Sequence, residues 1–115
     1  MQFDPKSFIQ VSKDLESGQT EAHFRSIINR SYYAAFGYIR NSLGIHTEDG
    51  SVHQATISTL MGSVNTSHKI AAKRLETLFK LRKEADYKHN KPMQAWRCES
   101  VISDAEAIIK LFDTT

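Results

Sequence analysis

The sequence predicts an all-α domain, a compact bundle of four to five helices. Five stretches carry apolar residues at the three- and four-residue spacing of one helix face, and no stretch alternates apolar and polar residues as a half-buried strand does. Capping and helix-ending residues separate these stretches. At 115 residues the chain can bury one core but not two, so we expect a single domain over residues 1–115.

Two helices are expected in the first part of the chain. Asp4 can cap the first helix, with Pro5 at its first helical position, and Gly18 ends it. Thr20 can cap a long second helix that runs to Gly44. The apolar face of the second helix recurs at helical spacing through its whole length, as expected for a helix at the centre of a bundle.

A polar loop over residues 44–50 is expected to precede a third helix. Ser51 and Gln54 form a capping-box pattern for that helix, which continues to about Gly62. The apolar residues of this stretch again recur at helical spacing.

Two more helices complete the prediction. The fourth is expected from about His68 to about Tyr87. A clear break follows, because the residue before Pro92 is steered away from helical geometry. Pro92 itself can open the fifth helix at its first position, where the missing N–H costs nothing.

Composition and charge narrow the classes of function. The net charge of +2 is too small to indicate a nucleic-acid-binding protein by itself, although lysines and arginines crowd residues 69–91. That crowding fits either a solvated helix face or a basic binding surface. Cys98 is the only cysteine, so no intramolecular disulfide can form, and the chain shows neither a signal peptide nor a membrane-spanning stretch. We therefore expect a cytoplasmic protein.

The sequence suggests neither a metal site nor a cofactor site. The five histidines are scattered, and no pair of ligands is spaced to share one helix face. The chain has no glycine-rich phosphate loop and no serine or cysteine motif of covalent catalysis. We expect no metal and no cofactor.

Polar side chains on two helices are the candidates for a functional site. Arg30 and Tyr33 lie beside the apolar face of the second helix, and Arg82, Asp86 and Tyr87 end the fourth. These residues can form a nucleotide- or RNA-binding cluster, or an interior clamp that only stabilises the bundle. An aspartate that follows an arginine by four residues is the weaker order for a local helix pair, so we expect Asp86 to pair with Arg30 instead.

Two short motifs resemble those of HEPN-domain proteins. The run Asn-Arg-Ser-Tyr-Tyr-Ala-Ala-Phe over residues 29–36 resembles their second-helix signature, in which an arginine precedes a pair of aromatic residues. The run over residues 78–87 is similar to their Leu-Arg-x-x-Ala-Asp-Tyr signature. The helix order between the motifs agrees as well, so the resemblance covers about residues 5–112. It is strongest to the small stand-alone branch, which is often paired with a minimal nucleotidyltransferase.

The resemblance implies a homodimeric, metal-independent endoribonuclease. Such proteins use an arginine and a histidine separated by four to six residues, and two copies of the pair meet at a dimer interface. Arg82 and His89 fit this pattern, with six residues between them. A histidine can transfer the protons of ribose cleavage, and an arginine can stabilise the charge of the transition state. The implied role is the toxin or effector of a toxin–antitoxin or phage-defence pair.

A non-catalytic protein is the alternative. In that interpretation the chain is a nucleotide- or partner-binding subunit that works with a nucleotidyltransferase, and Arg30 and Tyr33 hold a nucleotide or stabilise the bundle. Lys83 stands after Arg82, where catalytic members of the family usually carry Asn, Asp or His. His89 lies in a polar stretch, where an exposed histidine needs no function.

Overall fold

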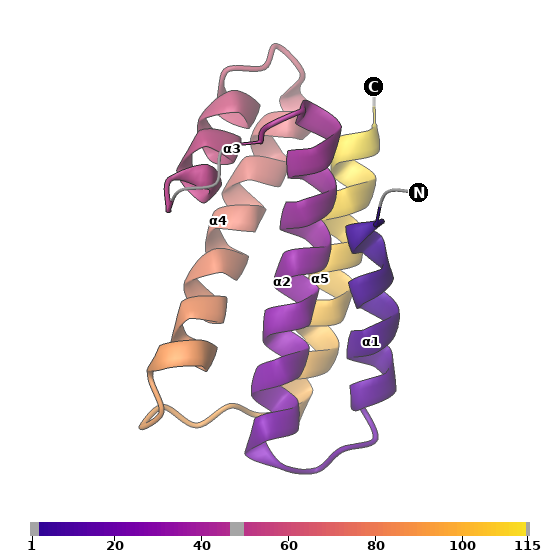
Figure 1. The fold of residues 1–115 in the computed structure, drawn as a ribbon, viewed down its shortest axis with the longest axis vertical. Coiled ribbons are helices and arrows are strands. Elements are labelled where there is room, and N and C mark those ends of the chain that lie inside the picture. Colours follow the sequence, from indigo (N-terminus) through magenta and orange to yellow (C-terminus); the bar gives the residue numbers. More distant parts are fainter. Residues whose placement is uncertain (1–2, 47–49, 115) are drawn as a thin grey trace.

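The structure, a computed structural model, describes residues 3–46 and 50–114, and within these ranges all of its regular secondary structure is helical. It confirms the all-α prediction (Figure 1). Residues 47–49 of the expected polar loop lie outside the described residues. In chain order the elements are a short 3₁₀ helix η1 (Pro5–Ser7), α1 (Phe8–Leu15), α2 (Glu21–Leu43), α3 (Val52–Met61), α4 (Thr66–Tyr87) and α5 (Ala95–Asp113).

Helix α2 is the centre of the bundle and packs against every other helix. Figure 1 shows α2, α4 and α5 running alongside one another, with α1 beside α2 and α5 and with α3 at one end of α4. The face of α2 that is apolar in the sequence is the buried one; Ile28 and Ile39, for example, have no exposed surface. Gly37 lies where η1 crosses α2, and a Cβ there would come within 2.7 Å of Pro5. Glycine at this position therefore allows the close approach.

The predicted caps Asp4, Thr20 and Gly44 are confirmed, whereas the first α-helix ends at Leu15, three residues before the predicted Gly18. The Asp4 carboxylate accepts a hydrogen bond from the Lys6 amide at 3.0 Å, and the Thr20 hydroxyl accepts one from the His23 amide at 3.3 Å. Gly44 ends α2 in the left-handed region, at φ 70°, where glycine avoids the steric cost of a side chain. Local sequence alone was enough to place these caps.

The start of the last helix was predicted wrongly. Pro92 does not open it; α5 begins at Ala95, and Gln94 is its extended N-cap. The reason is tertiary, because Met93 is buried in the core and its amide donates a 2.9 Å hydrogen bond to Glu21 on α2. The buried side chain of Met93 and its hydrogen-bonded amide keep residues 93 and 94 extended after the proline.

The helices of the described residues are those of a globular bundle. None of them is long and apolar enough to cross a membrane. The largest core cluster lies between α2, α4 and α5, with Tyr32, Leu75 and Ile108 among its fully buried members. Cys98 is buried in a smaller cluster with Ile27, and burial raises the pKa of its thiol to about 11. The thiol therefore stays protonated near neutral pH.

Candidate functional site

Most of the predicted site residues gather where α4 ends beside α2. Arg82 lies at the centre of this cluster. Its guanidinium carbon is 5.6 Å from the centre of the Tyr33 ring and 5.9 Å from that of Tyr87. Its guanidinium also donates a 3.0 Å hydrogen bond to the Asp86 carboxylate. The backbone carbonyl of Asp86 in turn contacts His89. Five of the six predicted residues are thus connected through Arg82 and Asp86.

The guanidinium of Arg82 is largely buried in an aromatic environment. Only 13% of the side chain is exposed, and its guanidinium carbon lies 5.5 Å from the Tyr32 ring centre and 5.4 Å from that of Phe79. Burial by itself would lower the pKa of Arg82, but the hydrogen bond to Asp86 and the nearby tyrosines outweigh it and raise the pKa. Arg82 is therefore a permanent positive charge. Its Nε is buried without a hydrogen-bond partner among the described residues.

Asp86 is held from two helices. Besides Arg82 on its own helix, it accepts hydrogen bonds from the Asn29 side-chain amide of α2, at 3.1 and 3.3 Å to its two oxygens. The carboxylate is 22% exposed. Three hydrogen bonds to one carboxylate make Asp86 a polar contact that helps to align α4 with α2.

The predicted ion pair between Arg30 and Asp86 is wrong. Asp86 pairs with Arg82, and Arg30 is exposed, with its guanidinium carbon 5.5 Å from the centre of the Phe8 ring. The rule that disfavours an arginine four residues before an aspartate describes exposed pairs on isolated helices. Here Asn29 and the surrounding rings hold the two side chains together, and that tertiary support outweighs the local preference.

His89 is exposed but oriented. It lies in the turn after α4, and its Nε2 is 2.9 Å from the Asp86 carbonyl oxygen. A carbonyl oxygen only accepts hydrogen bonds, so Nε2 carries the proton and Nδ1 is left as the nitrogen that can exchange a proton with another molecule. This is the tautomer and orientation that a general acid–base histidine needs.

Arg25 holds the segment that carries His89, a role that was not predicted from the sequence. Its guanidinium donates hydrogen bonds to the carbonyl oxygens of Ala85 at 2.7 Å and Lys91 at 2.8 Å. It also pairs with Glu21 at 2.9 Å, which in turn accepts the Met93 amide. Arg25 therefore satisfies carbonyl groups at the end of α4 and fixes the connection to α5. The i, i+4 spacing of Glu21 and Arg25 was visible in the sequence, but the carbonyl partners were not.

An open pocket of about 400 Å³ lies beside His89 between α2 and the end of α4. Arg25 and Arg30 line it with Asn29 and Asp86. Asp86 is paired with Arg82 and Arg25 with Glu21, so Arg30 is the charged residue of the lining that makes no ion pair among the described residues, and it gives the pocket a positive charge. Such a pocket suits an anion such as a phosphate.

Comparison with models of known protein families identifies the family of this chain. The model of the HEPN domain family matches residues 6–114, almost the whole sequence. The chain belongs to the HEPN domain family. That family includes ribonuclease-like toxin effectors. Comparisons with curated proteins and with solved structures gave no match.

A second polar chain runs behind Arg82 through the interior of this HEPN domain. The Tyr32 hydroxyl lies 2.7 Å from Nδ1 of His53, and Nε2 of His53 lies 3.4 Å from a Glu76 carboxylate oxygen. The His53 ring stacks on Phe79 with ring centres 3.6 Å apart and planes 15° apart. No sequence signal indicates this chain, since Tyr32 and His53 are 21 residues apart and carry no motif.

Burial determines how the groups of this interior chain titrate. His53 is 7% exposed, and desolvation lowers its pKa despite the opposing effect of Glu76. Desolvation also raises the pKa of Tyr32. Near neutral pH the HEPN domain therefore holds a neutral histidine and a neutral tyrosine next to the charged Arg82.

The side chains that could bind a metal ion are scattered in the part of the HEPN domain that the structure describes. No group of three or more histidine, cysteine, aspartate or glutamate side chains is placed to hold an ion there. The candidate site consists of one histidine, three arginines, an aspartate and an amide, which are groups for proton transfer and anion binding.

Proposed function

We propose that this HEPN-domain protein is a metal-independent endoribonuclease that acts in the cytoplasm as the toxin or effector of a toxin–antitoxin or phage-defence pair. The observation that carries the proposal is the placement of His89. Its ring is exposed, held through Nε2 by the Asp86 carbonyl, and borders a pocket that also contains Arg25 and Arg30. A proton-transfer group beside an anion-binding surface is the arrangement that RNA cleavage requires.

The reaction would use the RNA's own 2′-hydroxyl. One histidine takes its proton as the 2′-oxygen attacks the adjacent phosphorus, and an acid protonates the departing 5′-oxygen. The products are a 2′,3′-cyclic phosphate and a 5′-hydroxyl. Arg30 lines the pocket and makes no ion pair among the described residues, so we assign it to the phosphate.

Arg82 would act indirectly, from the buried side of the site. It is largely buried and hydrogen-bonded to Asp86, so its first role is to hold the residue whose carbonyl orients His89. Its permanent charge, in low-dielectric surroundings, also favours an anion in the pocket. Arg82→Lys keeps the charge but loses the planar fork, so it should lower the cleavage rate.

A homodimer would complete the catalytic site. The reaction needs both a base and an acid, and each pocket contains one His89. Two protomers whose pockets face each other would supply both, and the symmetry of a two-fold dimer brings like residues together. Light scattering should therefore give about twice the 13.1 kDa of the monomer at micromolar concentration. A monomeric mass would count against the ribonuclease.

The second candidate is a non-catalytic nucleotide- or partner-binding subunit that works with a nucleotidyltransferase. A specific observation favours it, since Arg82 is buried, ion-paired and packed among four aromatic rings, as a purely stabilising residue would be. Tyr33 is half-buried against Arg82, and Arg30 remains at the surface to meet a nucleotide or a partner.

Cleavage of RNA in EDTA distinguishes the two candidates. The purified protein should cut a mixed RNA pool without divalent metal and should leave DNA and 2′-O-methyl RNA intact, since neither has a free 2′-hydroxyl. His89→Ala should lower the rate by about 10²–10⁴-fold, the usual contribution of general acid–base catalysis. His46→Ala is the matched control, because His46 is an exposed histidine in the loop after α2.

The outcomes separate the candidates clearly. Loss of cleavage in His89→Ala but not in His46→Ala supports the ribonuclease. If the wild type and His89→Ala leave RNA equally whole, or cut it equally, the ribonuclease proposal is wrong. Binding of RNA or nucleotide without cleavage then favours the second candidate.

A further inference from the structure

Tyr87 is an exposed aromatic residue at the end of α4. It is 72% exposed, and its hydroxyl has no hydrogen-bond partner among the described residues. The guanidinium carbon of Arg82 lies over the ring, 5.9 Å from its centre. Because the residue is so exposed, most of the ring surface remains free for another flat group to stack on it.

Three lysines line the same open hollow as this ring. The hollow has a volume of about 450 Å³ and is lined by Lys80, Lys83, Glu84, Tyr87 and Lys88, which together we call the Tyr87 surface. The three lysines are exposed and make no ion pair among the described residues. The carboxylate of Glu84 is balanced by the ammonium group of Lys91 at 3.1 Å. The Tyr87 surface therefore has a positive balance of charge.

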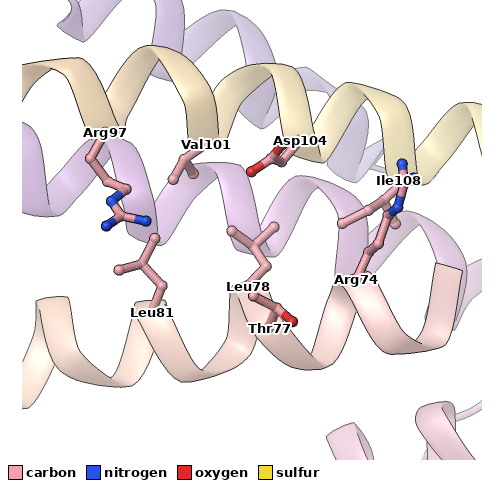
Figure 2. Close-up of a pocket in the computed structure, with 8 residues that line it drawn as sticks. All are labelled: Arg74, Thr77, Leu78, Leu81, Arg97, Val101, Asp104 and Ile108. Carbon is pink, nitrogen blue, oxygen red and sulfur yellow. The ribbon is translucent and has the colours of Figure 1, made fainter. Parts of the chain in front are cut away.

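The depression between α4 and α5 lacks this combination of charge and ring. Figure 2 shows Arg74 and Arg97 in it, together with Leu78, Val101 and Ile108. These three apolar residues are at most 4% exposed, and no aromatic residue of the described chain lines the depression. It offers a ligand positive charge without an exposed ring, whereas the Tyr87 surface offers both.

The Tyr87 surface lies next to the candidate site without being part of it. None of its lining residues lines the pocket of about 400 Å³ beside His89. Lys88 immediately precedes His89 in the chain, so an extended ligand that occupies that pocket can continue onto the Tyr87 surface. From Lys80 to Tyr87 the helix rises by about 10 Å, which exceeds the length of one nucleotide in a strand.

We propose that the Tyr87 surface binds single-stranded RNA on one side of the cleaved bond, with a base stacked on Tyr87 and phosphates on the lysines. The choice of RNA rests on the ribonuclease function proposed above. An unpaired base stacks on an aromatic ring and its phosphates attract lysines, so a single strand uses both features of the surface. The bases of a duplex are already stacked on one another, and an acidic peptide needs only the lysines.

Binding of RNA that cannot be cleaved tests the inference separately from the ribonuclease. The probe is a fluorescent single strand of 2′-O-methyl RNA, about 12 nucleotides long, which is a usual length for single-strand sites. Fluorescence anisotropy with the full-length protein should show saturable binding. Tyr87→Leu should bind about tenfold more weakly, because the base loses the ring on which it stacks. Tyr87→Phe keeps the ring and should bind within about twofold of the wild type.

Salt dependence tests the lysines. Lys80→Gln/Lys83→Gln removes two phosphate contacts, so the slope of log affinity against log salt should become shallower by about 1.4, at about 0.7 for each contact with a single strand. The matched control is Lys69→Gln/Lys110→Gln, which removes the same charge at exposed positions outside the Tyr87 surface and should keep the wild-type slope. Circular dichroism should show the same helix content in all the variants.

Competing ligands test the class of occupant. Unlabelled duplex RNA of the same length and an oligoglutamate of the same charge should each displace the probe at least about tenfold less well than the unlabelled single strand does. Equal competition by the oligoglutamate would overturn the inference and indicate that an acidic segment of a partner protein occupies the surface. Equal competition by the duplex would show that no base stacks on Tyr87.

Three results with the variants would also overturn the inference. They are no saturable binding to the wild type, equal binding by Tyr87→Leu and Tyr87→Phe, and equal changes of slope in the two lysine variants. The ribonuclease proposal fails or stands separately. If the expected binding is seen but ordinary RNA stays whole, the RNA-binding surface stands and the ribonuclease fails. If RNA is cut but the Tyr87 variants bind alike, the ribonuclease stands and this inference fails.

Discussion

The guanidinium of Arg82 donates a 3.0 Å hydrogen bond to the carboxylate of Asp86, one turn later on α4. Pairs at this spacing on exposed helices contribute only a few tenths of a kcal/mol. This pair differs because the two side chains are 13% and 22% exposed and the guanidinium lies among four aromatic rings. Without its partner, the Arg82 charge would have little access to water, so the pair should matter to stability.

Loss of the Asp86 charge is the first test. Asp86→Asn should lower the free energy of unfolding by about 2 kcal/mol, because it leaves a largely buried arginine without a counter-ion. For a domain of this length, that corresponds to a fall in Tm of roughly 8 °C. Asp104→Asn is the control, since Asp104 is exposed and makes no ion pair among the described residues. Equal Tm values for the two variants would show that Asp86 is not important to the stability of the fold.

Arg25 should stabilise the connection that carries His89. Arg25→Gln removes hydrogen bonds to the Ala85 and Lys91 carbonyls and should cost about 1–2 kcal/mol of stability. Hydrogen exchange should show faster exchange of the hydrogen-bonded amides of Lys88, Lys91 and Met93, because this connection loses its fixed contact with α2. Arg30→Gln changes an exposed arginine that only stacks on Phe8 and should leave that exchange unchanged. Equal effects of the two substitutions would contradict the role assigned to Arg25.

The two adjacent tyrosines of α2 should respond differently to loss of their hydroxyls. Tyr32→Phe removes the group that lies 2.7 Å from His53 and leaves a buried ring nitrogen without a partner, so it should cost about 1–2 kcal/mol. Tyr33→Phe removes a hydroxyl with no hydrogen-bond partner among the described residues and should change stability by less than about 0.5 kcal/mol. Urea unfolding measures both variants. A larger effect at Tyr33 would show that the interior polar chain is not important.

Stability should fall in mild acid because of His53. Burial lowers the pKa of this ring in the folded protein, below the ordinary 6.5 that applies to the unfolded chain. As the pH falls below 6.5, the unfolded state binds a proton that the folded state resists, so the free energy of unfolding decreases.

The variant His53→Gln isolates this contribution. Urea unfolding at about pH 8 and about pH 5.5 should show a smaller loss of stability for His53→Gln than for the wild type. His46→Gln, at an exposed position, should lose as much stability between the two pH values as the wild type does. If His53→Gln loses as much stability in acid as the wild type does, another group causes the pH dependence.

Sequence reasoning worked best where the signal was local. Asp4 and Thr20 were predicted as caps from their type and position, and both accept the amide hydrogen bonds of capping residues. It failed at Pro92, where the proline preference for a helix start was correct as a rule. The burial of Met93 and its hydrogen bond to Glu21 delayed the helix to Ala95.

The candidate site likewise has one part that could be predicted from the sequence and another that only the tertiary structure determines. Arg82, Asp86 and His89 lie within eight residues of one another, so their proximity at the end of one helix could be predicted from the sequence. The partner of Asp86 could not, because the choice between Arg30 and Arg82 depends on where Asn29 and the aromatic rings lie.

The sequence by itself determined the helical class, most helix ends and the HEPN membership, because periodicity, caps and short motifs act over a few residues. The tertiary structure alone decided the contacts between residues distant in the chain. Arg25 meets a carbonyl 66 residues later, and Tyr32 meets a histidine 21 residues later. Helical spacing predicts which face a side chain occupies, but the packing of whole helices determines which neighbour it meets there.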